Sequence, residues 1–317
     1  MFRVFGSLLA GWLALGGAHA ADRKDCPVGG ATPMMVARVV DGRTFATSEG
    51  RVVRLAGVLV PSAYEAGADA GSWTFEEEAR RYLSELLVGK TVVLAPSAGT
   101  DGRDRHGREI GQVHVLAGDG ALWVQGALIE RGLAVAVPVA RVPACHDVAL
   151  EREAGARDSK AGVYATPFWR IIDLGSRRAI GGEVDGSFQV MRGVVQRTWR
   201  RRDGMIVRVG GTRRGGTVVE VLMDGNAFSA LAPTEAGRSV VGRAVEVRGW
   251  LERRDGDDRP AVSRWSGGAR YQVNTIVAGG LRFTDGVVGV AETQSAGDAQ
   301  SAVPGGAAHP SPVTGQK

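Results

Sequence analysis

Residues 34–60, MMVARVVDGRTFATSEGRVVRLAGVLV, decide the fold of the N-terminal half of the chain. Apolar and β-branched residues fill three short runs, which predict strands at Met34–Val40, Thr44–Thr47 and Arg51–Val60. Turn pairs beginning at Asp41 and Glu49 separate the runs, as is typical of antiparallel strands joined by tight turns. The stretch therefore predicts a three-stranded meander.

The residues after this meander complete a small, mainly β fold of the α+β type. Further strands are expected at Thr91–Ala95 and Glu109–Leu116, with helices at Phe75–Leu87, Trp123–Gly132 and Val148–Ala161. Five strands and three helices in this order indicate a five-stranded Greek-key barrel, the OB-fold.

A second strand-rich region follows, and it predicts a second small OB-like barrel at residues 187–277. Its strands are expected at Gln189–Gln196, Gly204–Val209, Thr217–Met223 and Ala244–Leu251. Trp250, in the middle of the last strand, is expected in the core. The remaining segments are a lead-in at 21–35, a linker at 171–186 and a disordered tail at 278–317, with the first barrel at 36–170.

Composition excludes a disordered chain and a polytopic membrane protein. The 317 residues are 44% hydrophobic and 23% charged, enough to build a globular core, and no apolar run reaches the length of a membrane span. The net charge of +5 favours an anionic partner, although so small an excess also fits a protein that is merely soluble.

Met1–Ala20 has the pattern of a secretory signal peptide, with Arg3 before a short apolar stretch and Ala18-His19-Ala20 as a cleavage site. We therefore expect a periplasmic or secreted protein cleaved near Ala20, and a retained N-terminal anchor is the alternative. Cys26 and Cys145 are the only cysteines. In an oxidising compartment, this pair predicts a disulfide.

Five segments between residues 36 and 170 carry a more specific signal. They are VVDGRT (39–44), RLAGVLVP (54–61), DRHGR (104–108), WVQGALIERGLA (123–134) and AGVY (161–164). In this order they resemble the thermonuclease (staphylococcal-nuclease-like) family. The resemblance implies a five-stranded barrel with three helices, which in active members hydrolyses phosphodiester bonds of DNA or RNA with one calcium ion.

The same resemblance shows where this chain departs from the active pattern. Two calcium-binding aspartates of the family correspond to Arg43 and Leu59, and the general-base glutamate corresponds to Ser62. Two arginines that hold the phosphate correspond to Arg54 and Arg108, which are present. We therefore expect a residual phosphate clamp and no cofactor, with calcium relevant only if the enzyme is active.

Alternatives remain open for both the acids and the arginines. Asp41, a weak metal candidate, and Glu65 and Asp69 are nearby carboxylates that could replace the missing ones, or they are turn and loop residues. Arg54 could instead pair with Glu65 or Asp69, and Arg108 with Asp104.

The second region adds a candidate binding loop, and it resembles the downstream module of some exported thermonuclease-like proteins. Trp199, Arg200, Arg201 and Arg202 form one run, and residues 183–276 hold sixteen arginines against eleven acids. An aromatic residue among arginines on a barrel loop is suited to single-stranded nucleic acid, which stacks its bases and pairs its phosphates. The alternative is a solvated hairpin.

The sequence thus supports three hypotheses. The first is an exported, catalytically impaired protein that binds single-stranded nucleic acid or another polyanion weakly and in a salt-sensitive way. The second is an active metal-dependent phosphodiesterase that uses substitute carboxylates. The third is a structural or interaction module of the cell envelope. Fold alone does not choose among them.

Overall fold

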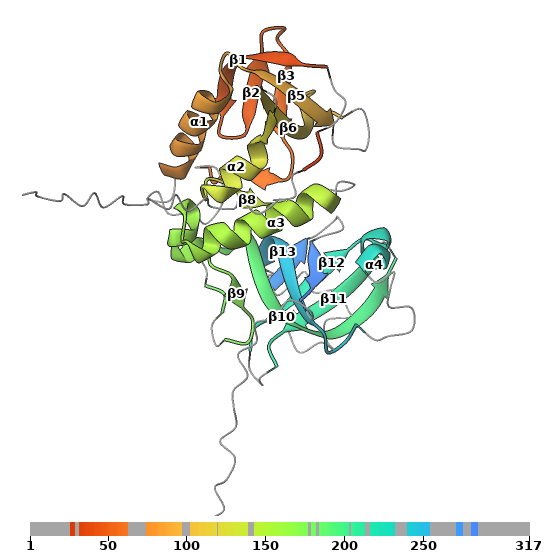
Figure 1. Cartoon of the computed structure of the whole chain (residues 1–317). Helices are drawn as coiled ribbons and strands as arrows, with labels where there is room; N and C mark the ends of the chain where they lie inside the picture. The colour runs from red at the N-terminus through yellow and green to blue at the C-terminus, as the bar shows by residue number, and fades with distance from the viewer. Residues whose placement is uncertain are drawn as a thin grey trace, which may run out of the picture. The chain divides into compact units, whose positions relative to one another are not determined.

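The structure is a computed structural model, shown in Figure 1. It describes residues 26–28, 32–62, 74–96, 102–118, 120–138, 143–176, 179–181, 184–202, 204–212, 216–231, 240–253, 271–274 and 280–284. All of these belong to one compact unit. The expected signal peptide and most of the expected tail lie outside the described residues. In the part of the chain that is described, no helix is long and apolar enough to cross a membrane.

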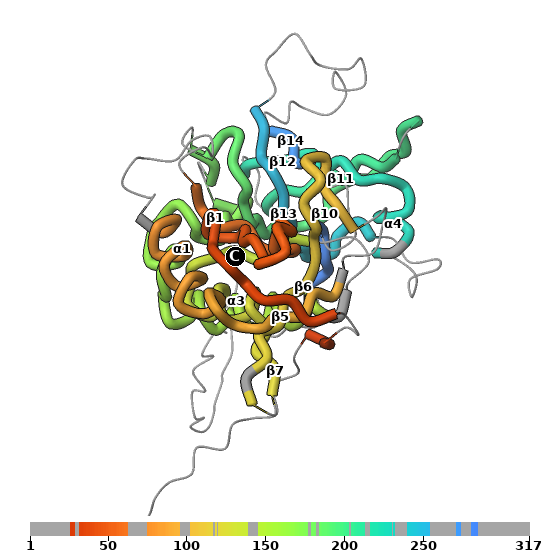
Figure 2. Tube along the Cα trace, turned by 90° about the horizontal axis from the view of Figure 1, so that it is seen from above, coloured from red at the N-terminus to blue at the C-terminus, as the bar shows by residue number. Residues whose placement is uncertain are grey.

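The first sheet closes into a five-stranded barrel. Its strands are β1 (Met34–Asp41), β2 (Thr44–Thr47), β3 (Val52–Leu55), β5 (Thr91–Pro96), β6 (Glu109–Ala117) and β7 (Gly120–Trp123), in the order β3-β2-β1-β5-β6-β7. β3 also pairs in parallel with β6, which closes the ring and leaves β7 attached outside it. Figure 2 views this barrel from above, with β1 and β5 near the viewer.

Three helices accompany the first barrel, as the sequence predicted. They are α1 (Thr74–Leu87), α2 (Val124–Glu130) and α3 (Pro143–Asp158), followed by two 3-10 turns at Gly162–Ala165 and Pro167–Trp169. Ala79, Leu83 and Leu87, one side of α1, are fully buried in the barrel core. α3 begins at Pro143, five residues before the expected start, because proline is well suited to the first turn of a helix.

The expected continuous strand at 51–60 is wrong. The chain bends at Gly57, whose φ of 76° lies in the left-handed region that favours glycine. After the bend, β4 (Val58–Leu59) leaves the barrel and pairs with β8 (Val135–Ala136). Leu59 is thereby separated from the strand that carries Arg54.

The second sheet closes by the same pattern of pairings. Its strands are β9 (Ile172–Asp173), β10 (Ser187–Arg201), β11 (Gly204–Gly210), β12 (Val218–Met223), β13 (Ala244–Arg253), β14 (Tyr271–Asn274) and β15 (Leu281–Phe283). The ring runs β10-β11-β12-β14-β13 and closes where β13 pairs with β10. In both rings the third strand pairs in parallel with the fifth, and a helix separates the third from the fourth, here α4 (Gly225–Leu231). The predicted fold class, a five-stranded barrel followed by a second small barrel, is confirmed.

Residues expected to lie between and after the barrels contribute to the second core. Within the expected linker, β9 pairs with β10, and Leu174, Ile180 and Val184 are buried. Within the expected tail, β15 pairs with β13 and buries Leu281. A short strand next to glycine-rich sequence carries too few apolar residues to be recognised by pattern alone.

The Cys26–Cys145 disulfide is present and confirms the prediction. It joins the segment before β1 to the first turn of α3, and both half-cystines are buried. The backbone oxygen of Cys26 lies 2.9 Å from His114 Nε2 in β6, so the bridge is also held against the barrel.

An interface of apolar contacts and a buried ion pair joins the two barrels. Leu59 and Val135 of β4 and β8 share one hydrophobic cluster with Phe188 and Val190 of β10. Beside this cluster Arg248 of β13 is buried, and its guanidinium bonds Glu153 of α3 at 2.9 Å. Figure 1 shows α3 beside β13. The second barrel is therefore fixed to the first by apolar packing and by a buried charge pair.

Glu246 extends this charge network within the second barrel. Burial alone would raise its pKa, but the cations of Arg248, Arg282 and Arg192 lower the pKa of Glu246 to about 2. Arg248 contributes through an Nε contact of 2.9 Å. Each buried carboxylate of the network therefore stays ionised because an arginine contacts it directly.

Candidate nucleic-acid interface

Two arginines of the first barrel line one pocket. Arg43 lies in the turn between β1 and β2, and Arg54 lies in β3 opposite Thr44 and beside Ile110 of β6. The pocket has a volume of about 370 Å³. Its other lining residues are Leu55, Ala56, Gly57, Val58, Leu59, Ile110, Val137, Pro138 and Trp250. The pocket therefore combines cationic groups with apolar walls.

The electrostatics of the pocket favour an anion. Burial, followed by the charges of Arg43 and Arg108, lowers the pKa of Arg54, while Asp41 and Asp104 act in the opposite direction. A bound anion would relieve the repulsion among these three guanidinium groups, and arginine binds phosphate through two parallel hydrogen bonds.

Arg108, the second predicted clamp residue, does not line the pocket. Its Nε donates to Asp104 Oδ2 at 2.7 Å, and its backbone N–H donates to Asp104 Oδ1 at 3.0 Å. The alternative of an Arg108–Asp104 pair is therefore what the structure contains. Arg108 acts on the pocket through its charge on Arg54. Glu65 and Asp69, the proposed partners of Arg54, lie outside the described residues.

The two positions that correspond to calcium ligands in active members of the resembling family carry side chains that do not fit the ion. Arg43 is cationic, and Leu59 offers no oxygen and is 3% exposed within the cluster formed with Phe188 and Val190. Calcium requires six to eight oxygen ligands, mostly carboxylate. Asp41 Oδ1 accepts the backbone N–H of Arg43 at 2.8 Å, as a turn residue does. Among the described residues no three His, Cys, Asp or Glu side chains come together in a metal-binding group.

Trp250 is the pocket residue that sequence reasoning placed wrongly. It is 43% exposed instead of buried in the core. A signal was available, because Val245, Val247 and Leu251 point into the second barrel and the intervening residues therefore point outward. One of these outward residues, Arg248, bonds Glu153 in α3 of the first barrel.

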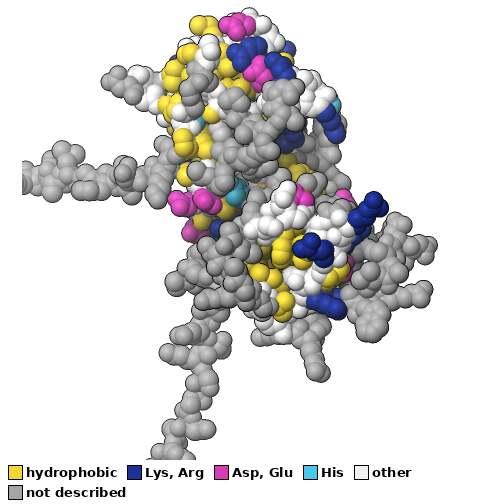
Figure 3. All heavy atoms as spheres, turned by 90° about the vertical axis from the view of Figure 1, so that its right-hand side faces the viewer, with side chains coloured by type: hydrophobic (Ala, Val, Ile, Leu, Met, Phe, Trp, Pro, Cys, Tyr) yellow, Lys and Arg dark blue, Asp and Glu magenta, His cyan; other side chains and the backbone are white. Residues whose placement is uncertain are grey.

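The predicted Trp199–Arg202 loop forms the end of a hairpin. Trp199 pairs with Ile206 and Arg201 with Gly204 across β10 and β11. Trp199 is half-buried, and the three arginines are exposed. None of the four lines the pocket of Arg54. On the face drawn in Figure 3, Lys and Arg side chains lie at several separate places.

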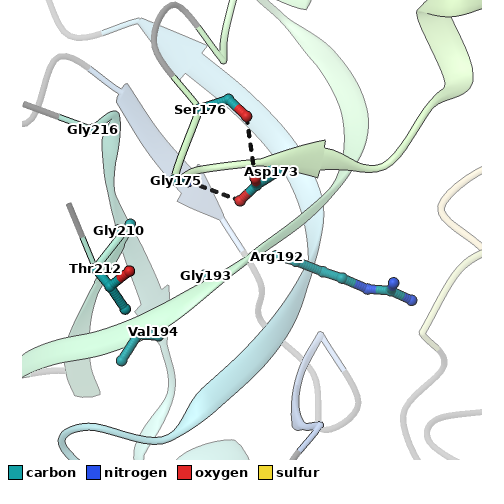
Figure 4. Close-up of a pocket in the computed structure, with 10 residues that line it drawn as sticks. Asp173, Gly175, Ser176, Arg192, Gly193, Val194, Gly210, Thr212 and Gly216 are labelled. Atoms are coloured by element: carbon teal, nitrogen blue, oxygen red, sulfur yellow. Dashed lines mark hydrogen bonds between the residues drawn. The ribbon is translucent and has the colours of Figure 1, made fainter. Parts of the chain in front are cut away.

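A larger pocket of about 670 Å³ lies in the second barrel, but its charged side chains, Asp173 and Arg192, already have partners. Asp173 accepts the N–H of Gly175 at 2.8 Å and the hydroxyl of Ser176 at 3.1 Å, and Figure 4 shows both bonds. Arg192 is directed away from them in Figure 4 and bonds Glu246 at 3.1 Å. Glycine backbone forms much of the remaining wall.

Comparison with known protein families identifies the first barrel. Residues 52–166 match the family model described as staphylococcal nuclease homologue. The chain contains a staphylococcal nuclease-homologue domain. The match begins at β3, so Asp41 and Arg43 precede it, yet β2 pairs with β3 and belongs to the same barrel. A comparison with curated proteins found no match.

Two of the resembling segments meet inside this nuclease-homologue domain. The backbone of Gly132 touches that of Gly162, and Val163 N–H donates to Gly132 O at 2.9 Å. A side chain at either glycine would overlap the opposite backbone. Close backbone approach therefore explains why both segments carry glycine here.

Proposed function

We propose that this protein is an exported, catalytically impaired nuclease homologue that binds single-stranded nucleic acid, or another polyanion, through Arg54 and its cationic neighbours. The observation that carries the proposal is the joint lining of one pocket by Arg43 and Arg54, whose charges repel each other in the absence of an anion. The nuclease-homologue domain supports nucleic acid as the anion.

The residues at the positions that hold the metal and the general base in active family members support catalytic impairment. A lost general base costs about 10²–10⁴ in rate, and a lost metal ion removes several kcal/mol of transition-state stabilisation. Arg43 places a positive charge near the phosphate without an oxygen ligand for a cation. In this proposal the pocket holds a phosphate, and none of its described lining residues carries a carboxylate or imidazole that would activate water.

Export is part of the proposal. It rests on the signal-peptide pattern of Met1–Ala20 and agrees with the Cys26–Cys145 disulfide, since disulfides persist mainly in oxidising compartments.

Replacing Arg54 by alanine is expected to weaken binding of a single-stranded oligonucleotide about 10- to 100-fold, because one charge-assisted phosphate contact is lost. The slope of log K against log salt concentration should fall in magnitude by about 0.7, the value for one contact on a single strand. Fluorescence anisotropy across a salt series measures both quantities.

Arg80→Ala is the matched control, because Arg80 is an exposed arginine of α1 that pairs with Glu77. It should leave affinity and salt slope nearly unchanged. Equal losses for both variants would show that binding depends on net charge and not on the pocket.

A further inference from the structure

We infer that Trp250, supplied by the second barrel, is a stacking platform for a nucleobase in the arginine pocket of the first barrel. The inference rests on the proposed function and narrows it, because a stacking platform selects a polyanion with exposed bases. Single-stranded nucleic acid meets this condition, and a polyanion without bases does not.

Trp250 lies in the same pocket as the two arginines. Trp250 lines the pocket together with Arg43 and Arg54, although it lies in the other barrel. Aromatic rings beside phosphate-binding cations are the recurring arrangement in proteins that bind single strands. The pocket volume of about 370 Å³ lies within the range of small-ligand sites.

The indole of Trp250 is partly exposed and is held in place by a buried aromatic neighbour. Trp250 is 43% exposed, so part of its indole is free to contact a ligand. Phe188, itself 1% exposed, packs edge-on against the indole, with ring centroids 5.1 Å apart and planes at 73°. A buried neighbour that holds the ring reduces the entropy lost when a base stacks on it.

Contacts between the two barrels hold Trp250 in a fixed position relative to the pocket arginines. The strand of Trp250 pairs on both sides, with Phe188 in β10 and Asn274 in β14. Two residues earlier on the same face, Arg248 bonds Glu153 and the backbone oxygen of Ala136 in the first barrel. Val137, which follows Ala136 in the chain, lines the pocket. The indole is thus anchored to the barrel that carries the cations.

The test compares two octamers of equal charge, a single-stranded oligothymidylate and an abasic phosphodiester of the same length, bound to the full chain. The wild type should prefer the thymidylate by about 5- to 150-fold, the effect of stacking one base. Trp250→Leu, which keeps an apolar side chain against Phe188, should abolish this preference, and Trp250→Phe should retain part of it. Arg54→Ala should weaken both octamers and keep their ratio.

The controls distinguish base stacking on Trp250 from the binding of a polyanion by the pocket. Trp199→Ala should leave the preference unchanged, because Trp199 does not line this pocket. An undiminished preference in a folded Trp250→Leu variant, or equal binding of both octamers by the wild type, would overturn the stacking inference alone. Failure of both octamers to bind in a salt-sensitive way would overturn the proposed function and the inference with it.

Discussion

Replacing Leu59 by aspartate, the residue that active relatives carry at this position, is expected to lower the free energy of unfolding at pH 7 by about 4 kcal/mol. The substitution places a carboxylate in the cluster formed by Leu59 with Val135, Phe188 and Val190. A fully buried carboxyl group shifts its pKa upward by up to 3–5 units, which leaves the folded form mostly neutral at pH 7. The penalty at pH 7 therefore comes from the roughly 3 units between the unfolded pKa of about 3.9 and pH 7, at about 1.4 kcal/mol per unit. Urea denaturation measures the loss.

Two comparisons make this result specific. Leu59→Met keeps an apolar side chain of similar size and should cost less than about 1.5 kcal/mol. The folded-state pKa of the introduced carboxyl is raised, so the penalty should shrink as pH falls toward 4 and the group becomes neutral. A Leu59→Asp variant as stable as the wild type, with calcium raising its stability further, would show that the position still forms a metal site.

Replacing Arg248 by methionine is expected to cost about 3–5 kcal/mol, because it removes a buried cation that contacts two buried carboxylates. Arg248 contacts Glu153 and Glu246, each at 2.9 Å, and all three side chains are buried. The pKa of Glu153 is affected most by burial, which raises it, and is nevertheless lowered by Arg248 and Arg157. Thermal and urea unfolding at pH 7 measure the loss.

Arg253→Met is the matched control on the same strand, since Arg253 is 49% exposed and lies 3.8 Å from Asp185. It should change stability by less than about 1 kcal/mol. Adding Glu153→Gln to the Arg248 variant should recover part of the loss, because one of the two buried carboxylates that lose the Arg248 contact becomes neutral. A loss at Arg248 no larger than at Arg253 would contradict a structural role for the pair.

Local patterns predicted most of the first barrel. Turn pairs and short apolar runs lie next to each other in sequence, so β1, β2, β5 and β6 begin where expected. The bend at Gly57 escaped prediction, because a left-handed glycine inside an apolar run leaves no pattern. β14 was not predicted, because a strand of only four residues, which pairs in parallel with β12, is too short to show a clear pattern in the sequence. β10 extends past its expected end at Gln196 to Arg201. Backbone pairing with β11 keeps these last residues in the strand, although apolar and polar residues do not alternate among them.

The residues that line the pocket were predicted in part, and their role as a binding site stays a prediction. The sequence identified Arg54 and the missing carboxylates, since these follow from single positions in matching segments. It did not show that Leu59 packs against Phe188 and Val190, because this contact joins two barrels across about 130 residues. Alternation along β13 would have placed Trp250 outward, but only the arrangement of the barrels brings it to the pocket of Arg54.

The central claim is that this pocket holds a phosphate but does not hydrolyse its ester. The most direct measurement incubates an end-labelled single-stranded oligonucleotide with purified protein, in calcium and in chelator, and follows binding and cleavage in the same samples. We predict equal, salt-sensitive binding in both conditions and no cleaved product. Cleavage that requires the divalent ion, stops with chelator and is lost in Arg54→Ala would contradict the account.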